Sequence, residues 1–155
     1  MILSLAACNK ERMRLSIGCS NNEQVEVFVN QYQHSATGEP FDDNWLLCSV
    51  SVSFGSFSGQ FSASFQTYDF IKFSKELKNL YACLKGTATF EPLEGQLEIK
   101  LTGNGSGGIE LVGSCMDTVG VGNELNFSAG LDQTYLQSII SELDEVIENF
   151  PVRAL

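Results

Sequence analysis

Apolar and polar residues alternate in eight short stretches of this 155-residue chain. In residues 45–54, for example, Leu46, Cys48, Val50 and Val52 are separated by single residues, mostly serines. The eight stretches are 13–19, 25–32, 45–54, 60–66, 87–91, 97–101, 109–115 and 123–131. A period of two is typical of β-strands that bury one face. We therefore expect eight strands.

Two further stretches carry apolar residues at the spacing of an amphipathic helix. They lie at residues 70–84 and 136–147, each directly after a fourth strand. Most strands that are consecutive in sequence are separated by short turns, so their pairing should be mainly antiparallel. The pattern predicts an α+β fold with two amphipathic helices that cover one face of the sheet or sheets.

The junction between fourth strand and helix occurs twice, because residues 61–80 resemble residues 127–146 without gaps. The identical pairs are Phe61/Phe127, Ser62/Ser128, Ala63/Ala129, Glu76/Glu142 and Leu77/Leu143. We therefore expect duplicated ββββα units, with halves at about residues 13–85 and 86–150, in a single domain over residues 13–155. The alternative is a chance match between two similar junctions.

The first twelve residues precede the first alternating stretch, and two interpretations of them are open. The letters LAAC at residues 5–8 resemble a bacterial lipoprotein cleavage box. However, the residues before Cys8 include no Lys or Arg, and the apolar stretch is far shorter than that of a signal peptide. We therefore expect residues 1–12 to be an N-terminal extension that the fold does not need.

The charge balance narrows the class of partner. The formal net charge is −10, and no Lys or Arg occurs between Arg14 and Lys72 or between Lys100 and Arg153. Such a surface repels a phosphate backbone and attracts a basic protein, although net charge can also serve solubility alone. No apolar run approaches a membrane span. We expect a cytoplasmic protein with a basic protein partner, no nucleic acid and no membrane contact, and an oligomeric state that the sequence leaves open.

The residues that usually carry chemistry are sparse. Five cysteines form no C-x-x-C pair, and His34 is the only histidine, so we expect no metal site and no cofactor. Cys19, Cys48 and Cys115 fall on the apolar phase of strands and Cys83 lies in a helix, which predicts reduced, buried thiols. No nucleophile with an oriented base is recognisable. We therefore expect a protein that is not an enzyme.

The connection over residues 33–44 is more informative. We take the short glycine-rich turn at residues 103–108 as its counterpart in the second half, so the first half has gained an acidic loop flanked by aromatic residues. Loops of this kind often carry binding function. We expect a partner-binding site formed by Glu39, Phe41, Asp42, Asp43 and Trp45.

Alternatives to this site are open at this point. Phe41 and Trp45 could simply cap the end of the core. The acidic residues of the 33–44 loop could instead serve a small-molecule-binding domain or a small hydrolase, because paired carboxylates perform such chemistry. The next candidate surface is the acidic second helix, with Glu142, Asp144, Glu145 and Glu148.

Several short motifs resemble the WapI-type immunity proteins, which are bacterial partners of polymorphic toxins. They are DNWL at residues 43–46, GSFSG at 55–59, LEGQLEIKL at 93–101, GNELNF at 122–127 and LDQTYL at 131–136. The resemblance extends from about residue 13 to residue 151. It implies direct binding and neutralisation of a cognate toxin in the cytoplasm, often a nuclease. It implies no catalytic residues.

Overall fold

The computed structural model describes residues 12–153, and its elements follow one order twice, four strands and then a helix. The first unit consists of β1 (Met13–Ser20), β2 (Glu23–Tyr32), α1 (Pro40–Asp43), β3 (Trp45–Phe54), β4 (Phe57–Gln66) and α2 (Thr67–Cys83). The second consists of β5 (Lys85–Phe90), β6 (Leu97–Asn104), β7 (Gly108–Met116), β8 (Glu124–Asp132) and α3 (Thr134–Asn149). Strands β1 to β4 form antiparallel sheet A, and β5 to β8 form antiparallel sheet B. The predicted α+β fold of duplicated ββββα units is confirmed; only the one-turn helix α1 was not expected.

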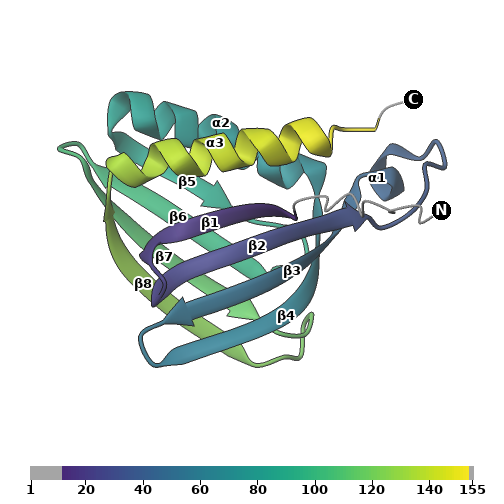
Figure 1. Ribbon diagram of the computed structural model, residues 1–155, viewed down its shortest axis with the longest axis horizontal. Coiled ribbons are helices and arrows are strands. Elements are labelled where there is room, and N and C mark those ends of the chain that lie inside the picture. Colours follow the sequence, from purple (N-terminus) through teal and green to yellow (C-terminus); the bar gives the residue numbers. More distant parts are fainter. Residues whose placement is uncertain (1–11, 154–155) are drawn as a thin grey trace, which may run out of the picture.

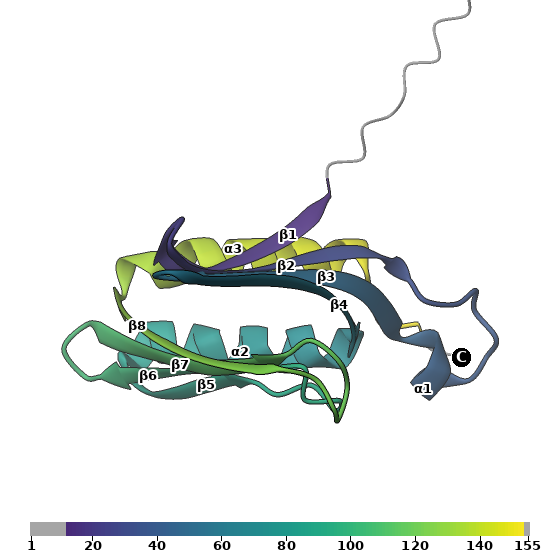
Figure 2. The ribbon, with the colours of Figure 1, turned by 90° about the horizontal axis from the view of Figure 1, so that it is seen from below.

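Sheets A and B lie face to face, and Figure 2 shows them as two layers. Their inward side chains share one hydrophobic core. Aromatic rings join the layers, since Phe54 of β3 stacks on Phe127 of β8 with ring centroids 4.3 Å apart. Phe65 of β4 likewise meets Phe90 of β5 edge to face at 5.2 Å. The alternating pattern of the strands therefore reflects burial between two sheets.

The two long helices lie beside the sheets and not over them. Helix α2 packs along β5, α3 packs along β1, and the helices contact each other. Figures 1 and 2 show both on the same side of the sandwich. The expectation that helices cover one sheet face is wrong, because the opposite sheet already covers each inner face. The apolar helix stripes instead close the side where β1 and β5 are the edge strands.

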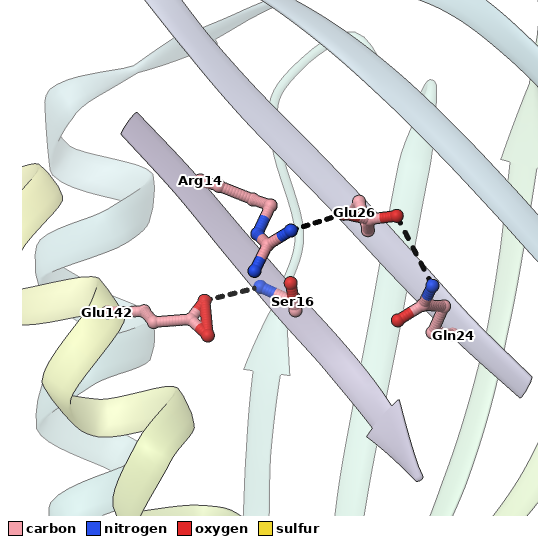
Figure 3. A network of polar contacts seen from close by, with 5 residues as sticks. All are labelled: Arg14, Ser16, Gln24, Glu26 and Glu142. Atoms are coloured by element: carbon pink, nitrogen blue, oxygen red, sulfur yellow. Dashed lines mark hydrogen bonds and ion pairs between the residues drawn. The ribbon is translucent and has the colours of Figure 1, made fainter. Parts of the chain in front are cut away.

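Two equivalent glutamates connect these helices to the edge strands. Glu142 of α3 accepts a hydrogen bond through Oε2 from the backbone N–H of Ser16 in β1, at 2.9 Å (Figure 3). Glu76 of α2, its counterpart in the repeat, accepts one through Oε1 from the hydroxyl of Thr89 in β5, at 3.4 Å. Burial raises the pKa of Glu142, and the Ser16 N–H opposes that shift. An exposed strand edge invites pairing with another strand, and α3 with its glutamate closes the edge of β1.

The cysteines differ in burial more than the sequence suggested. The four described cysteines are free, with Cys48 and Cys115 buried and Cys19 half-buried. Burial raises the pKa of Cys48 to about 12. Cys83 is exposed, so the prediction that it is buried is wrong: it is the last residue of α2 and lies off the apolar stripe. The interpretations of residues 1–11, including Cys8, lie outside the described residues.

Candidate functional site

The loop between β2 and β3 extends from one end of sheet A, where Figure 1 shows α1 standing clear of the sandwich. Helix α1 is a single turn with Pro40 at its start, a position at which proline's fixed φ favours a helix. Phe41 follows it and is 59% exposed. Its ring meets the half-buried Trp45 ring edge to face, with centroids 5.8 Å apart and planes at 89°. The loop thus holds one aromatic ring outward on top of another.

Asp43 fixes the shape of this loop from inside. Its Oδ1 accepts hydrogen bonds from the backbone N–H and the hydroxyl of Thr37, each at 2.8 Å, and its Oδ2 accepts one from the Gly38 N–H at 2.8 Å. The hydrogen bond from the Thr37 backbone is the main reason that the pKa of Asp43 is lowered. The side chain is buried. Asp43 therefore shapes the candidate site and does not form part of its outer surface.

Asn44 connects the same loop to the C-terminal segment. Its Nδ2 donates to the backbone carbonyls of Pro40 at 2.6 Å and Arg153 at 3.0 Å, and its Oδ1 accepts from the Arg153 N–H at 2.7 Å. The Arg153 guanidinium lies 3.5 Å from the ring centroid of Tyr32 and donates to the carbonyl of His34 at 2.9 Å. The residues after α3 thus support the loop from behind.

The outward part of the site is more apolar and less acidic than the sequence indicated. Glu39 and Asp42 are exposed on either side of Phe41. Leu47 is also exposed, two residues after Trp45 and so on the same face of β3. Sequence reasoning missed Leu47, although its place among the outward serines of β3 was a usable signal. The set Glu39, Phe41, Asp42, Trp45 and Leu47 is called the loop surface below.

A hollow of about 700 Å³ lies beside the start of the loop. Its lining includes Tyr32, His34, Phe150 and Arg153, where β2, the loop and the end of α3 meet. Tyr32 packs edge to face on Phe150, with centroids 5.4 Å apart, and its hydroxyl donates to the carbonyl of Pro151. These contacts serve the attachment of the C-terminal segment.

The carboxylates that could support hydrolysis do not converge. Asp42 is exposed, whereas the Asp43 carboxylate is occupied by Thr37 and Gly38. Asp132 accepts hydrogen bonds from the N–H and the hydroxyl of Thr134, which lower its pKa. Within residues 12–153, no group of three or more His, Cys, Asp and Glu side chains is placed to hold a metal ion.

Helix α3, the acidic second helix expected from the sequence, uses two of its acidic side chains in contacts within the molecule. Glu142 contacts β1, and Asp144 forms an ion pair with Lys78 of α2 at 2.9 Å. Only part of the acidic surface predicted on α3 is therefore available to a partner.

Comparison with known proteins assigns the chain to a protein family. The chain matches none of the curated proteins. None of the helices described between residues 12 and 153 has the length and apolar character to cross a membrane. The family model described as "Immunity protein WapI-like family" matches residues 16–151, which include both long helices, the whole loop surface and all of both sheets except the first three residues of β1. The chain belongs to the WapI-like immunity protein family.

Proposed function

We propose that this protein neutralises a cognate toxin domain by binding it directly, and that the loop surface forms part of the contact. Membership of an immunity protein family is the observation that carries the proposal. A family of this kind acts through binding, so the surface of interest is one that presents groups outward without a catalytic centre. The loop surface meets that description.

The aromatic centre of the loop surface supports a binding role. Phe41 is exposed while its ring is held on Trp45, and the loop beneath it is fixed by the hydrogen bonds of Asp43 and Asn44. A side chain that is already ordered loses little conformational entropy on binding. Aromatic residues in this position commonly contribute most of the affinity of an interface.

The charges around the aromatic pair favour a basic partner. Glu39 and Asp42 are exposed beside Phe41, and the net charge of the chain is −10. Two described cations lie near this region, and both are engaged within the molecule: Arg153 is directed onto Tyr32 and the His34 carbonyl, and Arg12 donates to Asn30 and Ser49 on the outer face of sheet A. Complementary charge accelerates association and makes it sensitive to salt. A basic toxin domain, such as a nuclease, would complement the charge of this surface, and we propose that the protein binds it in the cytoplasm.

Kinetic measurements on a candidate toxin domain, for instance one encoded beside this chain's gene, test the proposal. Phe41→Ala should speed dissociation and weaken binding by about 2 kcal/mol, the size typical of an aromatic anchor. Tyr81→Ala is the control, because Tyr81 is an exposed aromatic residue on α2. Asp42→Asn should slow association and reduce its salt dependence. Equal binding by the wild type and Phe41→Ala would refute the loop surface as the contact.

The hydrolase alternative has less support. It would rely on the acidic residues of the loop, and the Asp43 carboxylate is already occupied by Thr37 and Gly38. We therefore infer a protein that acts by binding and not by catalysis.

A further inference from the structure

Each sheet has one edge beside a helix and one edge without such cover. Helices α3 and α2 lie along β1 and β5, whereas β4 and β8 form the edges on the opposite side of the sandwich (Figure 1). The first half of β4 is the more open segment, since Phe57, Ser58, Gly59 and Gln60 are all exposed. Phe57 is 68% exposed. Proteins usually protect a long, uncharged strand edge, so an open one requires a partner or an explanation.

The outward backbone groups of β4 can be assigned from two contacts. The Ser62 carbonyl accepts a hydrogen bond from Gln96 Nε2 at 3.3 Å, and the Gln66 N–H donates to Asp69 Oδ2 at 2.8 Å, so both residues direct their backbone away from β3. Backbone orientation alternates along a strand, which directs Ser58 and Gln60 the same way. Within residues 12–153, no backbone hydrogen bond occupies Ser58 or Gln60 on that side.

Gly59, between these two residues, is not required by the packing of a single molecule. A Cβ at this position would meet only the Val52 Cγ2 atom, at 3.9 Å, which is ordinary van der Waals contact. Gly59 also does not adopt the left-handed φ that favours glycine. A glycine inside a strand often marks a place where another backbone approaches closely.

The charge pattern separates β4 from the other open edge. Strand β4 carries no charged residue, whereas β8 begins with Glu124 and ends with Asp132. Antiparallel pairing of β8 with a second β8 about Ser128 would place Glu124 opposite Asp132 of the other copy, a repulsive arrangement. Pairing of β4 with a second β4 has no such cost.

We propose that β4 pairs with β4 of a second copy of this chain, antiparallel and centred on Gly59. Ser58 of each copy then lies opposite Gln60 of the other, and the two residues exchange backbone hydrogen bonds. Phe57 lies opposite Phe61 of the second copy on the same face, and such aromatic pairs stabilise neighbouring strands. The same patch serves both copies, as a closed twofold dimer requires.

This dimer leaves the loop surface free. Figure 1 shows α1 at one end of sheet A and the β3–β4 turn at the other. The pairing uses only residues 57–61, so the Gln96 contact with the Ser62 carbonyl can persist. A dimer of this kind would present two loop surfaces at once, and it stands independently of the toxin-binding proposal.

Sedimentation of the full chain, over concentrations up to about 1 mM, tests the proposal. A reducing agent prevents the exposed Cys83 from linking copies. We expect a reversible monomer–dimer equilibrium. Gln60→Pro removes an outward N–H that β3 does not use, and should weaken dimerisation at least about ten-fold. Ser128→Pro is the matched control on the edge of β8, and should leave the equilibrium unchanged.

A charge exchange at Gly59 gives a second test that does not depend on proline. Gly59→Lys places like charges opposite each other across the twofold axis, and so does Gly59→Glu. Each variant alone should be monomeric, and an equal mixture should form a mixed dimer. A wild-type chain that stays monomeric throughout, or a mixture that does not associate, would overturn the proposal. Dimerisation of either variant alone as strongly as the wild type would do the same.

Discussion

The two halves of the chain differ most at the connection between the second and third strands of each sheet. In sheet A, residues 33–44 form a long loop with its own helical turn, whereas in sheet B residues 105–107 form a tight turn. In each connection, one side chain accepts hydrogen bonds from two backbone N–H groups at that connection. The two oxygens of Asp43 accept from Thr37 and Gly38 in the loop. In the turn, the amide oxygen of Asn104 accepts from the Ser106 N–H at 2.7 Å and from Gly108.

This difference shows how a repeated frame can acquire a distinct surface. The strands and helices of both halves bury equivalent apolar positions, so they leave little freedom for variation. A connection outside the core can lengthen at low cost, provided that its backbone N–H groups find acceptors. The two oxygens of a carboxylate can accept more hydrogen bonds than one amide oxygen. The longer connection accordingly has the carboxylate of Asp43, and the tight turn has the amide of Asn104.

Removing the two side chains should have unequal consequences for the proposed function. Asp43→Ala leaves the N–H groups of Thr37 and Gly38 without their acceptor, so Phe41 should lose its fixed position. We expect toxin binding to weaken at least about ten-fold, the largest effect among these comparisons. Asn104→Ala should loosen only the 105–107 turn and leave binding unchanged. Titration calorimetry on both folded variants checks this, and a similar loss in both would show that the loop is not special.

The sequence predicted the strands well because each strand buries one face, and a buried face leaves a period of two. It did not predict where the helices lie. The stripe of Phe70, Phe73 and Leu77 shows that one side of α2 is buried, but not whether a sheet face or an edge strand buries it. That depends on sheet B covering sheet A, which is a long-range contact. Cys83 was misjudged for a related reason, since being within a helix does not place a residue on its buried side.

The candidate site was predicted only in outline. Asp42 and Asp43 are adjacent acids in one loop, and no local signal shows that only Asp43 turns inward to Thr37 and Gly38. The contact between Asn44 and Arg153 joins residues far apart in the sequence, so periodicity could not reveal it. Leu47 could have been recognised, because an apolar residue in the outward register of β3 departs from the serines around it.

The two edge-contacting glutamates offer a second comparison between the halves, with a smaller expected effect. Glu142→Ala removes the acceptor of the Ser16 N–H and should cost about 1–2 kcal/mol of unfolding free energy. Glu76→Ala should cost about 0.5 kcal/mol or less, because its bond to the Thr89 hydroxyl is long and its Oε2 has no hydrogen-bond partner among the described residues. Denaturant unfolding of both variants measures the difference. Equal losses would mean that the two glutamates support their edges equally.

The smallest effect concerns the dependence of stability on acid. Asp43→Asn and Asn104→Asp together exchange the side chains that hold the two connections, so the acid-sensitive carboxylate should move from the first half to the second. The pKa of Asp43 is lowered, chiefly by the Thr37 N–H. Its stabilising contribution is therefore complete above its ordinary pKa of 3.8 and is lost as the pH falls through the lower folded value. Asp43→Asn should accordingly make the unfolding free energy fall less steeply below about pH 4.

The reciprocal change, Asn104→Asp, places a carboxylate at the N–H groups of Ser106 and Gly108. Those donors should lower its pKa in the folded state, so the unfolding free energy of this variant should fall more steeply with acid than that of the wild type. Asp42→Asn is the control, because the exposed Asp42 lies beside Asp43 without sharing its contacts with Thr37 and Gly38. Unfolding curves between about pH 5 and pH 2 test all three variants. If Asp42→Asn changed the slope as much as Asp43→Asn, the acid response would come from loop charge in general and not from the carboxylate that shapes the loop.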